Sequence, residues 1–206
     1  MAEKNAIVSL EGVMWAGEGL VTGTYNEMVK QKMINENNRF SVSNSKSMLK
    51  AIGRGIKGKT PRDMSPLADE VSRQSVARVD DRVASLLKQF TKEEHQLFAM
   101  SSAPHFVVEA ALGMLEEETE VSFSQEHILS SVYPMENGRY TGQALRLPKK
   151  RAVEGLMKDL GVTSIDIGII NGLPDCGWAA FCTVPLPINP GPGLISYLET
   201  SKTDPA

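Results

Sequence analysis

The sequence predicts an α/β protein with a mainly parallel sheet flanked by helices and a small helical insertion near its N-terminal end. Short apolar runs typical of buried strands alternate with stretches of helical periodicity. This alternation is typical of parallel sheets covered on both faces. The stretch after the first run is rich in Gly, Asn, Ser, Met and Lys, which indicates an insertion. We expect a core formed by 1–14 and 80–200, a helical insertion over 15–79, and a flexible tail over 201–206.

The elements of the first half follow from apolar periodicity. Residues 6–10 form a short apolar run that predicts a buried strand. Within the insertion, helical patterning is visible around 25–34 and 46–52. After it, 80–90 has apolar residues at helical spacing, and LFAM at 97–100 predicts a second buried strand. Interruptions of the helices in the insertion are expected at Gly53, Gly55, Gly58, Pro61 and Pro66.

The middle of the chain predicts a helix followed by weaker strand signals. The helix begins near 106–115. The segments 121–123 and 128–132 alternate weakly between apolar and polar residues. Asn137 and Gly138 then form an Asn-Gly pair, which is the strongest short signal for the turn of a β-hairpin.

The last quarter predicts a further helix and two further strands. Apolar residues in 153–160 have helical spacing, and Gly161 stands where a left-handed C-cap is expected. The run at 164–170 predicts a strand, 175–182 a short helix, and VPLPI at 184–188 the last strand.

The composition is that of an ordinary globular protein. Hydrophobic residues make up 41% of the 206 residues, enough for one domain with a substantial core. The net charge of -3 shows no basic excess, so general electrostatic binding to nucleic acid or to an anionic membrane is not expected. Apolar runs fall short of the ~20 residues of a membrane span, and no signal-peptide pattern is visible, which predicts a cytoplasmic protein. Cys176 and Cys182 lack CxxC spacing and are expected to be buried free thiols.

Polar side chains of kinds that bind anions or perform catalysis follow the predicted strands. Because the carboxyl ends of parallel strands meet at one edge of a sheet, we expect these side chains to lie close together. The candidates are Ser9 and Glu11 after the first strand, Ser101 and Ser102 after the second, Lys149 and Lys150 before a helix, and Asn171 and Asp175 after a later strand.

Four segments resemble the haloacid dehalogenase-like (HAD) hydrolases in order and spacing, and within them the phosphoserine-phosphatase-like branch. They are AIVSLEGVMW, FAMSSAPHFVVEAAL, NGRYTGQAL followed by two lysines, and IGIINGLPDCGWAAFCTVPLPINPGPGL. The resemblance covers the chain from residue 6 to about 198. It implies a HAD-like Rossmannoid core, with the insertion as a helical cap.

At the catalytic positions that the resemblance implies for the first segment, this chain has residues that differ from those of the family. Ser9 stands where the family has its aspartate nucleophile, and Glu11 where it has the aspartate that serves as general acid and base. A serine cannot form an aspartyl-phosphate, and it would need a neighbouring base to act as a nucleophile itself. The extra methylene of Glu11 shifts its carboxylate by about a bond length, and a misplacement of that size costs ~100-fold in rate. Val13 replaces a threonine hydroxyl.

The phosphate-binding and metal-binding positions that the resemblance implies are partly kept. The resemblance implies that Ser101 and the backbone near Ser102 hold phosphoryl oxygens, and that Lys149 or Lys150 pairs with the phosphate, with helical spacing favouring Lys149. In the family, acids of the last segment bind Mg²⁺, which prefers carboxylate oxygens. Here Asn171 replaces one acid and Asp175 remains, which argues against a metal site. Asp175 has the alternative role of capping the short helix that follows Pro174.

These replacements predict a catalytically degenerate protein, or pseudophosphatase, that acts as a structural, regulatory or binding subunit. It would keep a residual anion pocket at Ser101, Ser102 and Lys149, and bind a protein partner or a phosphorylated small molecule. No cofactor is then expected. The alternative is a Mg²⁺-dependent phosphomonoester phosphatase that works through Glu11 and Asp175.

A basic stretch within the insertion has a separate interpretation. Lys46, Lys50 and Arg54 recur at every fourth residue and share one face of a predicted helix. They are candidates for binding an acidic partner or a phosphate group, and the alternative is a solvated surface. No aromatic residues are interleaved to stack on bases, so nucleic acid is not the expected partner.

Overall fold

The computed structural model describes residues 4–15, 19–35 and 45–201. Its centre is a five-stranded sheet with the order β3-β2-β1-β6-β7, and all four pairings are parallel. The predicted α/β class with a parallel sheet is confirmed. The strands are β1 (Lys4–Ser9), β2 (His95–Pro104), β3 (Ile128–Ser131), β6 (Ile165–Ile170) and β7 (Cys182–Pro187).

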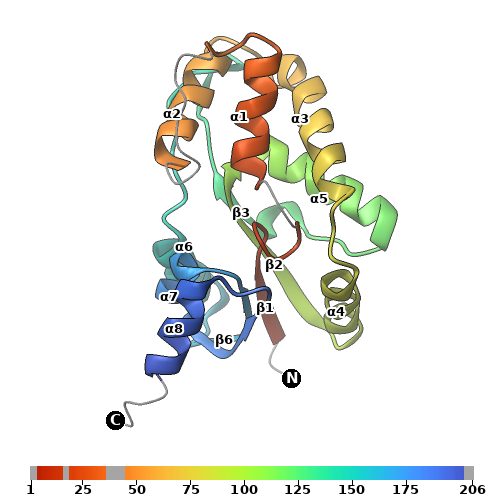
Figure 1. Ribbon diagram of the computed structural model, residues 1–206, viewed down its shortest axis with the longest axis vertical. Helices are drawn as coiled ribbons and strands as arrows, with labels where there is room; N and C mark the ends of the chain where they lie inside the picture. The colour runs from red at the N-terminus through yellow and green to blue at the C-terminus, as the bar shows by residue number, and fades with distance from the viewer. Residues whose placement is uncertain (1–3, 16–18, 36–44, 202–206) are drawn as a thin grey trace.

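Helices cover both faces of the sheet (Figure 1). Alternate side chains of β1 point to opposite faces, so Ala6 and Val8 pack into one hydrophobic cluster and Ile7 into the other. The first cluster contains side chains of α4 (Asp81–Lys92) and α5 (His105–Thr119). The second contains side chains of α6 (Lys149–Leu160), α7 (Leu173–Ala179) and α8 (Pro192–Ser201).

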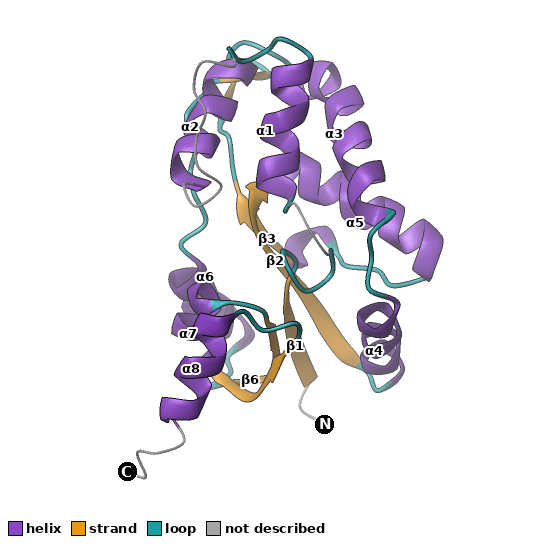
Figure 2. Ribbon diagram, viewed as in Figure 1, coloured by secondary structure: helices purple, strands orange, loops and turns teal. Residues whose placement is uncertain are grey.

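A layer of helices lies beyond the carboxyl ends of the strands (Figure 2). It consists of α1 (Leu20–Lys30), α2 (Ser45–Ile56) and α3 (Pro61–Val76). The hairpin of β4 (Met135–Glu136) and β5 (Arg139–Tyr140) turns at Asn137 and Gly138 as predicted. It joins this layer, since the Gly58 amide donates to the Tyr140 carbonyl oxygen.

The interruptions expected at Gly58 and Pro61 are confirmed, because α2 ends at Ile56 and α3 begins at Pro61, whereas those expected at Gly53, Gly55 and Pro66 are wrong. α2 runs through Gly53 and Gly55. A Cβ at Gly53 would lie 2.2 Å from the carbonyl oxygen of Gly142, so this glycine allows the hairpin segment to approach the helix. Pro66 lies inside α3 between the buried residues Met64 and Leu67, whose packing keeps the helix intact.

Several boundaries also differ from the sequence prediction. α1 begins at Leu20, five positions before the predicted start, and α7 ends at Ala179 because β7 begins at Cys182. Residues 121–123 are not a strand, although Val121 is buried. α8 was not predicted, and its end at Ser201 leaves the rest of the predicted tail outside the described residues. The predicted C-cap at Gly161 is confirmed, with φ of 68°.

The structure bears on two further features of the sequence, the length of its apolar helices and the state of its two cysteines. Within the described residues, no helix combines the length and apolar character that crossing a membrane requires. Cys176 is buried and Cys182 half-buried, and both are free thiols. Burial raises the pKa of the Cys182 thiol to about 12, which keeps it protonated and unreactive at neutral pH.

Candidate functional site

Ser9 is the last residue of β1 and is only 1% exposed. The alternation of the strand places its side chain on the same face as Ile7, toward α7. Its hydroxyl donates a hydrogen bond to Asp175 Oδ1 at 3.2 Å and accepts one from Lys149 Nζ at 3.2 Å. The structure therefore brings together three residues that lie far apart in the sequence.

Asp175 is the centre of this cluster and is 3% exposed. Its Oδ1 accepts from Lys149 Nζ at 2.8 Å and from the indole Nε1 of Trp178 at 3.2 Å, in addition to Ser9. Its Oδ2 accepts from the amides of Asn171 at 3.2 Å and Gly172 at 3.4 Å. One oxygen thus caps the start of α7, which confirms the predicted capping role, and the other binds Lys149.

The surroundings of Asp175 favour its ionised form. Burial by itself raises the pKa of this carboxyl group, because a low-dielectric environment disfavours charge. The charge and hydrogen bond of Lys149, with the Asn171 amide and the Trp178 indole, outweigh burial and hold the pKa below its usual 3.8.

This lowered pKa predicts how stability depends on pH. A carboxyl group with a depressed folded-state pKa contributes stability that is present above the unfolded pKa and is lost as pH falls through the folded pKa. We expect the wild type to be more stable than Asp175→Asn at neutral pH, and the difference to shrink below the usual pKa of 3.8. Urea unfolding of both proteins between neutral and strongly acidic pH measures this. A difference that stays constant throughout would contradict it.

The two candidate lysines at the start of α6 lie in different surroundings. Lys149 reaches inward, and its side chain is 15% exposed. Lys150 is exposed, and its ammonium lies 5.8 Å from the centroid of the Phe181 ring. Lys149 is therefore the lysine of the site.

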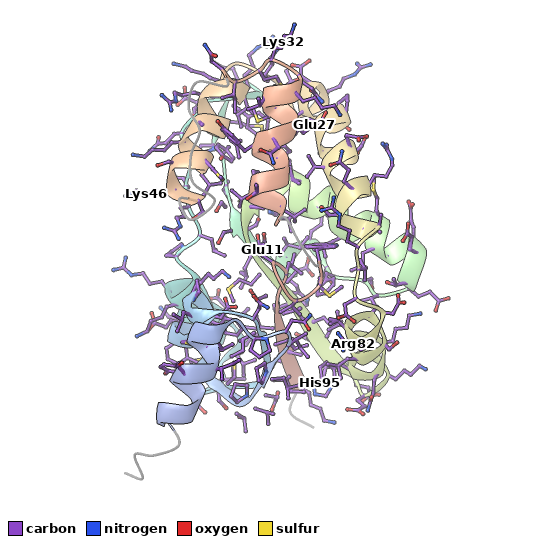
Figure 3. The ribbon with its side chains drawn as sticks, viewed as in Figure 1. Glu11, Glu27, Lys32, Lys46, Arg82 and His95 are labelled. Carbon is purple, nitrogen blue, oxygen red and sulfur yellow. The ribbon has the colours of Figure 1, made fainter. Side chains whose placement is uncertain are left out.

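Glu11 lies in the middle of the molecule, where the helical layer meets the sheet (Figure 3). Its Oε1 accepts from the Ser101 hydroxyl at 2.5 Å and from the Ser102 amide at 3.2 Å. Its Oε2 is buried without a hydrogen-bond partner among the described residues. Gly19, the N-cap of α1, lies over it, since a Cβ there would be 3.1 Å from Glu11 Cγ.

Ser101 and Ser102 belong to the end of β2 and not to a loop after it. β2 extends to Pro104, and its register with β3 shifts between Met100 and Pro104. Ser101 Oγ accepts from the Ala103 amide at 3.0 Å. This irregular strand end turns the Ser101 hydroxyl and the Ser102 amide toward one point, which Glu11 Oε1 occupies.

Asn171 connects the first loop to the last one. Its Nδ2 donates to the carbonyl oxygens of Gly12 at 2.9 Å, Ile188 at 3.1 Å and Asn189 at 2.6 Å. Gly12 has φ of 76°, and a Cβ there would lie 2.3 Å from Asn171 Oδ1. The amide thus joins two loops by hydrogen bonds to their backbone.

Two residues of the site were missed in the sequence. Trp178 follows Asp175 by three positions in a predicted helix, and this spacing was a signal for contact. Ser131 accepts from the Leu147 amide at 3.1 Å and donates to the Ser102 carbonyl oxygen at 2.7 Å. It holds the segment before α6 against β2, which no sequence pattern indicated.

The basic residues of α2 lie in the helical layer. Lys46, Lys50 and Arg54 are exposed on α2, and Figure 3 shows Lys46 on the outer side of that helix. Partner binding by this face stays a prediction.

Solved structures with a similar fold identify the architecture. A protein of unknown function from Bordetella pertussis Tohama I has a TM-score of 0.73 at 11% identity, over 98% of this chain and 97% of that chain. A phosphoserine phosphatase in apo form has a TM-score of 0.62 at 12% identity, over 94% and 90%. A HAD family hydrolase from Salmonella enterica subsp. enterica serovar Typhi has a TM-score of 0.60 at 12% identity, over 96% and 66%.

The chain has a HAD-like fold. The predicted resemblance to this fold and to phosphoserine phosphatase is confirmed at the level of structure. No protein-family model matches the sequence, and no curated protein matches it.

The residues that the HAD resemblance assigns to metal binding, Asn171 and Asp175, do not fit Mg²⁺ as they are arranged. This ion needs near-octahedral oxygen coordination, with carboxylates directed at it. Both oxygens of Asp175 accept hydrogen bonds, one of them from the Lys149 ammonium at 2.8 Å. The Asn171 amide nitrogen faces three backbone oxygens. In the described part of the chain, no three His, Cys, Asp or Glu side chains group in a way that could hold a metal ion.

Proposed function

We propose that this protein is a pseudophosphatase, a HAD-like fold that has lost phosphate-ester hydrolysis and acts as a structural, regulatory or binding subunit. The observation that carries the proposal is the position of Glu11. Its carboxylate accepts from the Ser101 hydroxyl and the Ser102 amide, the donors that the HAD resemblance assigns to phosphoryl oxygens. A phosphoryl group would have to displace this carboxylate before it reached them.

The chemistry at Ser9 supports the same proposal. Ser9 is only 1% exposed, so a substrate has little access to its hydroxyl. It donates to a carboxylate that also accepts from Lys149, and a serine cannot form the acyl-phosphate of the HAD resemblance. The general acid and base position is also changed, because Glu11 is hydrogen-bonded to Ser101.

The competing proposal is a Mg²⁺-dependent phosphomonoester phosphatase with an altered site. Its support is the similarity of fold to a phosphoserine phosphatase, with a TM-score of 0.62. It requires Glu11 to leave Ser101 and Ser102, and Asp175 to exchange Lys149 for a metal ion.

Hydrolysis assays distinguish the two proposals. We expect the purified protein to hydrolyse p-nitrophenyl phosphate and phosphoserine no faster with Mg²⁺ than without it, and no faster than Glu11→Gln or Asp175→Asn prepared in the same way. Glu117→Gln, on the exposed part of α5, serves as the matched control for contaminating phosphatases. Mg²⁺-dependent turnover that persists in Glu117→Gln and disappears in the two site variants would establish the phosphatase instead.

A further inference from the structure

An open basic pocket lies beside the site, at the start of α6. Its volume is about 580 Å³. Ser102 belongs to its lining, which contains four basic side chains and no acidic one. The cations are Arg146, Lys149, Lys150 and Arg151, and the apolar lining includes Leu147 and Pro174.

Three of these cations have no acidic partner. Lys149 is paired with Asp175 and belongs to the site already described. Arg146, Lys150 and Arg151 are exposed, and in the described part of the chain no carboxylate lies within ion-pair distance of them. Their charges therefore add to a positive field over the pocket, which the walls of the cavity concentrate.

The local sequence of α6 makes this arrangement unfavourable without a ligand. Pro148, the N-cap, makes no side-chain capping bond, and the first turn contains no acidic residue. Lys149, Lys150 and Arg151 instead place consecutive cations at the positive end of the helix dipole, where anions are favoured. Such a local conflict is more typical of a binding function than of a structural one.

We propose that this pocket binds a small organic molecule with two or more phosphate groups. One phosphate carries a charge of about -1.5 to -2 at neutral pH, so three unpaired cations match a diphosphate better than a monophosphate. Arginine and lysine both bind phosphate oxygens well. The apolar side chains of Leu147 and Pro174 provide a surface for the organic part of the ligand.

The inference deepens the proposed function and rests on it in one respect, namely that the ligand is bound and not hydrolysed. Glu11 fills the position between Ser101 and Ser102, so the phosphates stay in the outer pocket. The ligand therefore needs no contact with Ser9.

Calorimetric titration with inorganic phosphate, pyrophosphate and ADP at physiological ionic strength tests this proposal. We expect pyrophosphate to bind at least tenfold more tightly than phosphate, and ADP at least as tightly as pyrophosphate. The variant Lys150→Glu/Arg151→Glu should lose at least tenfold in affinity for pyrophosphate. Lys158→Glu, an exposed residue near the other end of α6, is the matched control and should change the affinity by less than twofold.

Loss of folding does not explain the expected result, because acidic residues in the first turn of a helix stabilise it. The double variant should therefore have a melting temperature, without ligand, no lower than that of the wild type. Equal affinities for phosphate and pyrophosphate would overturn the proposal, as would unchanged affinity in the double variant. Weaker binding of ADP than of pyrophosphate would overturn the part of the proposal that places an organic group against Leu147 and Pro174. Binding accompanied by hydrolysis would support the pocket as a phosphate-binding site but overturn the pseudophosphatase proposal.

Discussion

Asp175→Ala is expected to lower the free energy of unfolding by about 3 to 5 kcal/mol, the usual cost of removing one partner of a buried ion pair. Lys149 would keep a charge that is only 15% exposed and lose its counter-ion. The amides at the start of α7 and the Trp178 indole would lose their acceptor as well. For a chain of this size such a loss lowers the melting temperature by roughly 10 °C, which thermal unfolding measures.

The matched control for this variant is Asp159→Ala, because Asp159 is exposed on α6. We expect it to change stability by less than ~0.5 kcal/mol. The double variant Lys149→Met/Asp175→Leu removes both charges and should recover part of the loss, since no unpaired charge remains buried. Similar stabilities for Asp175→Ala and Asp159→Ala would show that the cluster around Asp175 contributes nothing to the free energy of unfolding.

Gly12→Ala is expected to cost about 3 kcal/mol, from two separate causes. The φ of 76° at Gly12 lies in the left-handed region, which disfavours a Cβ. The new Cβ would also lie 2.3 Å from Asn171 Oδ1 and displace the amide that holds both loops. Chemical unfolding in urea measures the loss in free energy.

Gly58→Ala separates the two causes. Gly58 has φ of 78°, nearly the same as Gly12, and nothing lies within 4 Å of an added Cβ. Its substitution should cost only the backbone strain of about 1 to 2 kcal/mol. The further loss in Gly12→Ala then measures the contribution of Asn171. Equal losses in the two variants would mean that Asn171 does not hold the loops together.

The order of strands and helices could be predicted from the sequence because each depends on local periodicity. The apolar run of β1, the helical spacing in α4 and α6, and the Asn-Gly turn at Asn137 are all local signals. The breaks expected in α2 were wrong because Gly53 and Gly55 serve close packing against other segments. A glycine that allows a close approach and one that ends a helix look alike in a sequence.

The site was predictable only in part. Parallel strands bring their carboxyl ends to one edge, so Ser9, Lys149 and Asp175 were expected together. The sequence did not indicate that Glu11 accepts a hydrogen bond from Ser101. Its direction depends on the register shift at the end of β2 and on Gly19 above it. The four cations of the basic pocket are neighbours in the chain at 146–151, but the sequence did not indicate that Ser102 and Pro174 complete the lining of a pocket around them.

The sequence by itself predicted the HAD-like fold class and the presence of Ser9 and Asp175 at the carboxyl ends of the strands, whereas their assignment to the nucleophile and metal positions of the family stays a prediction. These follow from residue identity, spacing and periodicity, which are properties of the chain alone. Only the tertiary structure decided that Lys149 and not Lys150 binds Asp175, that Asn171 holds two loops, and that Glu11 fills the Ser101 and Ser102 position. The physical reason is that hydrogen bonds and ion pairs depend on distances of a few ångströms, which are set by the packing of segments remote in sequence.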